Sequence, residues 1–227
     1  MLATRTAHRA LLSVLLAGTT MAVASPASAA DTWATTTVAS PDSTVIDFGD
    51  DIDIDVDIDV DIDSQSGDQP TEGTSTLYAR EATKRRWKAV GTSAAASPDY
   101  SAVTPRMTTS YTVVYHGHEA DSSQDDGYDA SDSAVFTVEV ARTITYPSGG
   151  FVLEGRVRPR YGNRPIVIKS SRSRSSGYVR HKAIRTDRRG RYSITLPRRK
   201  GTWYWTVKVK GDARYLPTDF QWETWVS

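Results

Sequence analysis

Carboxylates are the side chains whose type and spacing most directly suggest chemistry in this sequence. The segment Asp50–Asp63 reads DDIDIDVDIDVDID, and from Asp51 onward an aspartate alternates strictly with Ile or Val. On one face of a strand such carboxylates lie about 6.8 Å apart, and each neighbouring pair repels by about 0.6 kcal/mol in water. The row therefore needs counter-charge from solution cations, a bound metal or a surface rich in Lys and Arg. We call this row the acidic face: Asp51, Asp53, Asp55, Asp57, Asp59, Asp61 and Asp63.

Calcium is the metal whose preference for oxygen ligands fits this region. Four residues stand at positions 1, 3, 5 and 12 of a loop like that of an EF-hand: Asp61, Asp63, Gln65 and Glu72. Position 6, where that loop requires glycine, holds Ser66, and the alternating Ile and Val favour a strand instead. An EF-hand is therefore not expected. Weak binding of Ca²⁺ stays open at Asp63, Asp68 or Glu72, or within the acidic segment 121–132.

Histidines and serines offer little further chemistry. His116 and His118 are two residues apart, so on a strand both rings face one way and could chelate a metal. No third ligand follows in a recognised spacing, and a solvated strand end is the competing interpretation. The sequence has no nucleophile-elbow motif, and nothing in the acidic face singles out one carboxylate for the raised pKa that glycoside hydrolysis requires. We expect no enzymatic activity and no resident cofactor.

Guanidinium groups form the second conspicuous set. From Asp31 to Arg142 there are 22 acidic and 7 basic residues, a formal charge of −15; from Thr143 to Ser227 there are 5 acidic and 19 basic residues, a formal charge of +14. A region this basic is typical of a polyanion binder. Many of its cations lie in and around one apparent hairpin near 172–191. The candidate binding or docking residues are Arg172, Arg174, Arg188, Arg189, Arg191, Arg198, Arg199 and Lys200.

Three interpretations of this charge separation stay open. The basic part could bind an external polyanion, it could dock on the acidic part of the same or another copy of the chain, or both charged faces could simply be solvated. Nucleic acid enters only as a non-specific polyanion. Docking would cancel both net charges, so it competes directly with external binding.

The elements that must position these side chains are β-strands. In the segment 51–63 the period of two predicts a strand with its apolar side chains buried: Ile52, Ile54, Val56, Ile58, Val60 and Ile62. Short β-rich runs separated by Gly, Pro, Ser and Asp recur along the rest of the chain, which predicts an all-β protein. In one such run, Trp203 and Trp205 share a face with Val207 and Val209, so both rings are expected in a core rather than on a sugar-stacking surface.

The first thirty residues have the pattern of a secretory signal peptide. Arg5, His8 and Arg9 precede an apolar stretch, and small residues offer a cleavage site near Ala29. The apolar stretch is too short and broken for a membrane anchor, and no later segment approaches the length of a membrane span. Without cysteine the chain has no disulfide and no thiolate ligand. We therefore expect a secreted, extracellular protein without a membrane span.

Three pairs of segments indicate an internal duplication. Lys88–Thr92 matches Lys182–Thr186, Tyr100–Pro105 matches Tyr192–Pro197, and Tyr111–Gly117 matches Trp205–Gly211, in the same order and with nearly equal gaps. Two diverged copies of one unit explain this pattern. The predicted organisation is a signal peptide over 1–30, an acidic domain over 31–142 and a basic domain over 143–227.

The second copy resembles the tandem immunoglobulin-like repeats of secreted bacterial proteins. Those repeats often carry a TD-x-x-GRYS step followed by GD-x-x-Y, and this chain has Thr186–Ser193 (TDRRGRYS) and Gly211–Tyr215 (GDARY). The first copy keeps less of the pattern and has Ala96–Asp99 (ASPD) in place of the first step. The resemblance implies two tandem immunoglobulin-like antiparallel β-sandwiches. It does not specify a function, because such folds serve many roles.

The function expected from these observations is that of a secreted, non-enzymatic structural or adhesive protein of the cell surface or matrix. Its binding would rest on charge complementarity with an extracellular polyanion or with another copy of itself. A calcium-dependent binding module is one alternative. A carbohydrate-binding module is the other, based on Trp222 and Trp225, although side chains three apart face opposite ways on a regular strand.

Overall fold

The computed structural model describes residues 31–60, 69–122 and 125–227, and within those ranges the chain consists of strands and loops with no helix. The expected all-β class is confirmed. No helix among the described residues has the length and apolar character needed to cross a membrane. The predicted signal peptide and Asp61, Ile62 and Asp63 lie outside the described residues.

The first sandwich consists of two sheets. One has the order β2-β4-β7, with β2 at Thr35–Pro41, β4 at Ile52–Val60 and β7 at Tyr100–Val103. The other has the order β3-β11-β8-β5-β6, with β3 at Val45–Asp47, β11 at Phe136–Ala141, β8 at Thr109–Tyr115, β5 at Ser75–Glu81 and β6 at Lys88–Ser93. Short strands complete the sandwich: β10 (Ser131–Asp132) pairs with β8 of this sheet, and β1 (Thr32–Trp33) and β9 (Gly127–Tyr128) form a separate two-stranded sheet. The pairs β3–β11 and β1–β9 are parallel, so the first sandwich is not purely antiparallel.

The second sandwich repeats this plan. One sheet has the order β12-β13-β16, with β12 at Thr143–Ile144, β13 at Val152–Arg158 and β16 at Arg191–Thr195. The other has the order β15-β14-β17-β18, with β15 at Val179–Arg185, β14 at Pro165–Ser171, β17 at Gly201–Val209 and β18 at Thr218–Val226. The order β6-β5-β8-β11 of the first sandwich thus corresponds to β15-β14-β17-β18 of the second, and β2-β4-β7 to β12-β13-β16. The three matched segments of the sequence are the corresponding pairs β6/β15, β7/β16 and β8/β17, and the pairing order is that of immunoglobulin-like sandwiches.

The alternating segment forms β4, the central strand of its sheet, as the period of two predicts. Its apolar residues from Ile52 to Val60 are all buried, Ile54 and Ile58 completely, and those from Ile52 to Ile58 share one core with residues of β8 and β11. Its aspartates point to solvent, with Asp59 half-buried. The strand begins one residue later than expected, since Asp51 precedes it. A slip of one residue in pairing would bury every carboxylate, so this pattern fixes the register of the sheet.

The second sandwich has a core of its own. Trp205, Val207 and Val209 of β17 are buried in it together with Tyr192, Ile194 and Leu196, as predicted from their alternation. Trp205 donates its indole N–H to the hydroxyl of Thr224 at 2.9 Å, which satisfies the polar atom of this buried ring. Trp203 packs against the edge of the same core.

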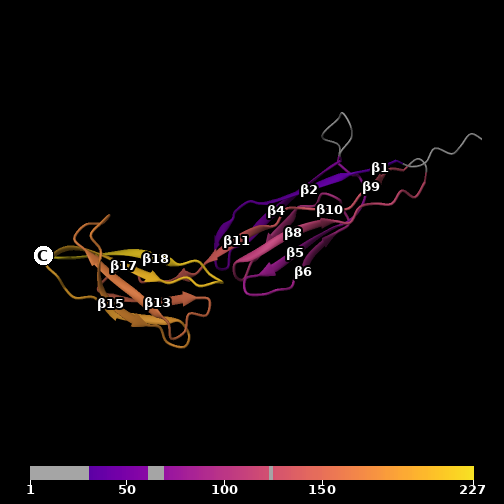
Figure 1. Cartoon of the computed structure of the whole chain (residues 1–227). Helices are drawn as coiled ribbons and strands as arrows, with labels where there is room; N and C mark the ends of the chain where they lie inside the picture. The colour runs from indigo at the N-terminus through magenta and orange to yellow at the C-terminus, as the bar shows by residue number, and fades with distance from the viewer. Residues whose placement is uncertain (1–30, 61–68, 123–124) are drawn as a thin grey trace, which may run out of the picture.

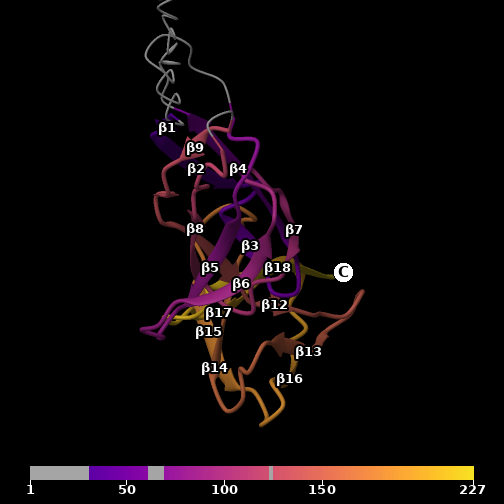
Figure 2. The same cartoon turned by 90° about the vertical axis from the view of Figure 1, so that its right-hand side faces the viewer.

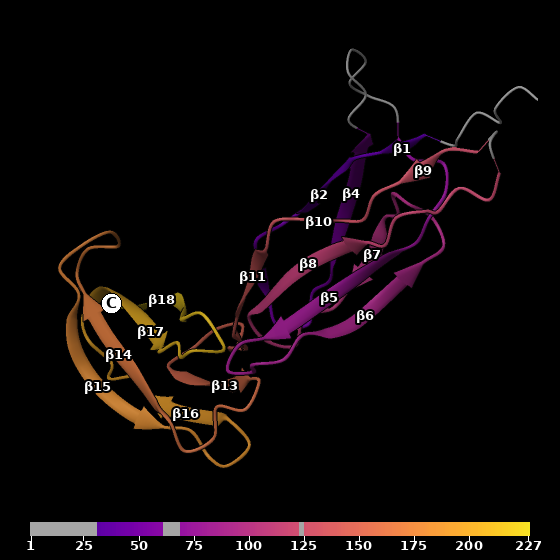
Figure 3. The same cartoon turned by 45° about the vertical axis from the view of Figure 1, so that its right-hand side comes forward.

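The two sandwiches lie end to end. Figure 1 shows β11 running from the first sandwich toward the second, and the C-terminus at the end of the second sandwich farthest from the first. In the view of Figure 2, β1 and β9 are again at one end of the molecule and β14 and β16 at the other. Figure 3 separates the layer with β2 and β4 from the layer with β5, β6 and β8. The broad faces of the two sandwiches are therefore not stacked on each other.

The GDARY segment makes the junction between the sandwiches. Tyr215 is buried in the core of the first sandwich, where its ring meets Phe48 edge to face and its hydroxyl donates to the carbonyl of Arg106 at 3.0 Å. The backbone adds two hydrogen bonds, from Thr108 to Arg214 and from Leu216 to Val140. A segment that follows β17 of the second sandwich thus completes the packing of the first.

An ion pair lies in the same junction. Arg142, whose side chain is only 2% exposed, donates to the Asp212 carboxylate at 2.7 Å, and its guanidinium lies over the rings of Tyr161 and Tyr215. Arg164 donates to the same Asp212 oxygen at 2.7 Å. Burial by itself would raise the pKa of Asp212, but the backbone N–H of Arg214 and the two guanidinium groups outweigh it and lower that pKa to about 2.

Candidate functional site

The predicted cationic residues divide into two groups in space. One group lies where the β14–β15 turn meets the loop before β17, next to the end of β18 and the C-terminus. We call it the tip cluster: Arg172, Arg174, Arg198, Arg199 and Lys200. The expected hairpin is β14–β15, and it contains only part of the arginine-rich segment. Because β16 pairs with β13 in the other sheet, Arg188, Arg189 and Arg191 form a separate group at the far end of β16, which we call the turn cluster.

Aromatic rings hold the guanidinium groups of the tip cluster in place. The Arg199 guanidinium lies 4.3 Å from the centre of the Trp203 ring and 5.4 Å from that of Trp205. The Arg172 guanidinium also lies over Trp203, at 4.7 Å, and donates to the carbonyl of Lys200 at 3.0 Å. Contacts of this type stabilise each cation by about 0.5–1 kcal/mol at exposed sites. The Arg198 guanidinium lies over the Phe151 ring at 5.3 Å, so three of the five charges are held against rings before any ligand arrives.

The tip cluster has no anionic partner among the described residues: the ion pairs there involve other side chains. The ring of His181 lies near this cluster and meets Trp205 edge to face. Burial lowers the pKa of His181, and Arg199 and Lys182 lower it further. A neutral imidazole there leaves the charge of the tip to its arginines and lysine.

The turn cluster is built differently. The carboxylate of Asp187 accepts the backbone N–H groups of Arg189 and Arg191, each at 2.8 Å, and so shapes the turn. The hydrogen bond from Arg191 is the largest cause of the lowered pKa of Asp187. An ionised carboxylate therefore lies inside this group of arginines and offsets part of their charge. The tip cluster has no such carboxylate partner among the described residues.

The acidic face makes no ion pair within the part of the chain that the structure describes. Asp53 accepts the backbone N–H of Ala102 at 2.8 Å, and Asp57 accepts the side-chain amide of Gln69. Across the pairing with β2, Asp57 stands opposite Val38, which is half exposed. The arginines of the second sandwich thus do not neutralise the described aspartates of β4 within one chain.

Replacing Asp55 by serine should leave the free energy of unfolding unchanged within about 0.5 kcal/mol or raise it slightly. The side chain is exposed, and its removal relieves repulsion by Asp53 and Asp57. Urea denaturation of both proteins at low salt measures the difference. A loss of 2 kcal/mol or more, on the scale of a broken charged contact, would instead reveal a bound cation or a specific ion pair at this position.

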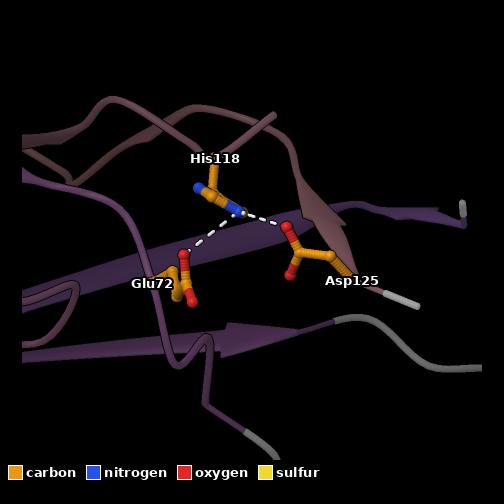
Figure 4. A group of neighbouring side chains, drawn as sticks. All are labelled: Glu72, His118 and Asp125. Carbon is orange, nitrogen blue, oxygen red and sulfur yellow. Dashed lines mark hydrogen bonds and ion pairs between the residues drawn. The ribbon is translucent and has the colours of Figure 1, made fainter. Parts of the chain in front are cut away.

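A third group of side chains combines a histidine with two carboxylates (Figure 4). The Nε2 atom of His118 lies 3.0 Å from an oxygen of Asp125 and 3.2 Å from an oxygen of Glu72. The hydrogen bond with Asp125 raises the pKa of His118 and lowers that of Asp125. The sequence leaves calcium binding open at Glu72 and in the segment 121–132, and metal chelation open for His118 together with His116. His116 is instead bonded to the hydroxyl of Thr76 at 2.9 Å.

The two C-terminal tryptophans do not share a surface. Trp222 packs against the core of the second sandwich and donates its indole N–H to the carbonyl of Gly150 at 3.0 Å. Trp225 is 65% exposed on the opposite face of β18. They face opposite ways, as their spacing predicts, so the pair offers no flat platform for a sugar ring.

Comparison with known proteins adds little to this description. No protein-family model and no curated protein matches the chain. Among solved structures, similarity is found to the human OSCAR ligand-binding domain, with 14% identity, a TM-score of 0.26 and coverage of 81% of this chain and 95% of that one. The three N-terminal domains of the bacteriophage RB49 outer capsid protein Hoc give 9% identity, a TM-score of 0.27 and coverage of 82% and 68%. A β-glucuronidase of Parabacteroides merdae gives 12% identity and a TM-score of 0.22, with 82% of this chain against 24% of that one. At such TM-scores none of these proteins informs on the ligand.

Proposed function

We propose that this protein is an exported, non-enzymatic structural or adhesive protein that attaches to polyanions through the tip cluster. The observation that carries the proposal is the gathering of five cationic side chains at one end of the second sandwich, without an acidic partner among the described residues. Polymers with phosphate groups are one ligand class that fits, because guanidinium groups bind phosphate oxygens in pairs of parallel hydrogen bonds.

The stacked arginines support this proposal in a second way. Ordering a long side chain on binding costs about 0.5–1.5 kcal/mol. For Arg172 and Arg199 this cost is smaller, because Trp203 and the carbonyl of Lys200 already order their side chains in the free protein. Arg198 is exposed with its guanidinium over Phe151, and Arg174 and Lys200 stay exposed and adjustable, as contact with an irregular polymer requires.

Reversing two exposed charges of the tip should weaken binding of long-chain inorganic polyphosphate by the full chain. We expect Arg174→Glu with Arg198→Glu to weaken it at least about tenfold at 0.1 M salt, since two phosphate contacts are replaced by repulsion. The slope of log K against log salt should fall by about two. Titration calorimetry at two salt concentrations measures both quantities.

The matched control reverses the same number of charges in the turn cluster, with Arg188→Glu and Arg189→Glu. Net charge then changes equally, but the tip is untouched. Equal weakening by the two double variants would mean that net charge alone decides binding, and the tip cluster would not be the site. If the unaltered chain does not bind polyphosphate at 0.1 M salt, the proposed function is wrong.

A further inference from the structure

We infer that Glu72, His118 and Asp125 form a binding site for one divalent transition-metal ion of the Zn²⁺ type. The three residues come from separate segments: Glu72 lies before β5, His118 after β8, and Asp125 before β9. The strands bring them together, because Ser75 pairs with Tyr115 and so joins the start of β5 to the end of β8. The group lies at the end of the molecule with β1 and β9, far from the tip cluster (Figure 1).

The distances suit a small ion. The ligand atoms of the three residues all lie within 4.8 Å of one another, and the imidazole nitrogen lies 3.0 and 3.2 Å from the two carboxylate oxygens. In a tetrahedral site with bonds of about 2.0 Å, ligand atoms stand about 3.3 Å apart. The two nitrogen–oxygen distances are therefore within a few tenths of an ångström of those in such a site, and the carboxylate oxygens, at most 4.8 Å apart, can close around an ion by side-chain rotation.

The charges also call for a cation. Both carboxylates of Figure 4 face the same nitrogen, Nε2 of His118, which can offer only one proton to the two of them. A divalent ion between the three atoms would bond all of them at once and balance both carboxylate charges. The nitrogen would then act as a ligand instead of a shared donor.

Hydrogen bonds hold the segments that carry the three ligands in place before an ion binds. The backbone N–H of His118 donates to the carbonyl of Tyr128 at 2.9 Å, and the N–H of Tyr128 donates back at 2.8 Å. The hydroxyl of Tyr115 donates to the carbonyl of Glu72 at 2.6 Å. The N–H of Asp121 donates to the ligand oxygen of Asp125 at 2.9 Å. This last bond reaches a ligand atom directly, and such bonds orient the ligands of protein metal sites.

The donor set selects the metal. Calcium takes six to eight oxygen ligands, whereas imidazole favours Zn²⁺, Ni²⁺ and related ions. One nitrogen and two carboxylates therefore favour a transition metal over the calcium considered for Glu72 and the segment 121–132. Three protein ligands leave a tetrahedral position open, and the Glu72 side chain is 57% exposed, so water or a partner's side chain can reach it.

The test is calorimetric titration of the full chain with ZnCl₂, and separately with CaCl₂, in a buffer that does not bind Zn²⁺. We expect one Zn²⁺ per chain at micromolar concentration and much weaker Ca²⁺ binding. His118→Gln and Glu72→Gln should each weaken Zn²⁺ binding about 10–100-fold or more, since even second-layer losses cost that much. His116→Gln, two residues away and bonded to Thr76, is the matched control and should leave the affinity unchanged.

Co²⁺ gives an independent readout, because its visible absorption reports tetrahedral nitrogen and oxygen ligands and should vanish in His118→Gln. The inference is wrong if Zn²⁺ binds only at millimolar concentration, if Ca²⁺ binds as tightly, or if His116→Gln weakens Zn²⁺ as much as His118→Gln does. None of these readouts involves polyphosphate, so the test of the metal site is independent of the test of polyanion binding by the tip cluster.

Discussion

Replacing Asp212 by alanine is expected to lower the free energy of unfolding by about 3 kcal/mol, because it leaves the buried guanidinium of Arg142 without a counter-charge. Removing one partner of a buried ion pair costs about 3–5 kcal/mol. The Asp212 side chain is 28% exposed, which places the effect at the lower end of that range. The remaining acceptors of Arg142 are the carbonyls of Pro159 and Lys210, at the long distances of 3.4 and 3.5 Å.

Asp219→Ala is the matched control for this variant. Asp219 pairs with Lys208 at 3.5 Å with both side chains about half exposed, and such surface pairs contribute about 0–1 kcal/mol. Urea unfolding followed by tryptophan fluorescence suits the comparison, since four of the six tryptophans are in the second sandwich. If both variants lower the free energy of unfolding by the same small amount, the ion pair between Arg142 and Asp212 does not couple the sandwiches.

Acid should reveal the same ion pair. The pKa of Asp212 is about 2 in the folded chain and near 3.8 when unfolded, so its contribution is complete above about pH 4 and is lost as the pH falls toward 2. The difference in stability between the unaltered chain and Asp212→Ala should therefore shrink over that interval. A constant difference between pH 5 and pH 2.5 would contradict the lowered pKa.

Replacing Ile58 by alanine should lower the free energy of unfolding by about 2–5 kcal/mol. The side chain is 0% exposed in the middle of β4, so its removal leaves a cavity between the two sheets of the first sandwich. Val38→Ala, on the neighbouring strand but half exposed, should change stability by no more than about 0.5 kcal/mol. Urea unfolding of the two variants measures this contrast, and equal losses would mean that the alternating strand does not face a packed core.

The strand β4 was predictable because its alternation leaves only one way to bury the apolar side chains. The duplication was predictable for a related reason: segments that match in order occupy the same place in both sandwiches. The sequence also favoured a core position for Trp205, and its neighbours Val207 and Val209 share that face.

The grouping of the arginines could not be predicted from their spacing. Arg191 and Arg198 are close in sequence, but β16 lies between them and its five residues span about 17 Å, so the candidates divide between two ends of the sandwich. The sequence does not specify which strands pair, and the expected hairpin near 172–191 grouped arginines that belong to different sheets. In the structure β16 crosses to the other sheet.

The sequence indicated Glu72, His118 and Asp125 as possible metal ligands but not that they meet. Each residue belongs to a segment that had been weighed for metal binding, but their meeting depends on the register between β5 and β8 and on the path of the loop after Gly117. Gly117 has a positive φ of 74°, and a Cβ there would lie 2.5 Å from the carbonyl oxygen of Tyr128. This close approach brings His118 back toward β9, and nothing in the local sequence specifies its target.

The burial of Tyr215 in the first sandwich has a consequence for the order in which the protein is made. The chain is synthesised from its N-terminus, so every strand of the first sandwich exists before Tyr215 does. Until then Phe48 lacks its aromatic neighbour and the end of the first sandwich lies open. The first sandwich therefore reaches its final packing only after β17 has been added, and a fragment that stops at Arg142 would lack a part of its own core. The last step of packing in the first sandwich thus depends on the second, although their strands form two separate sets of sheets.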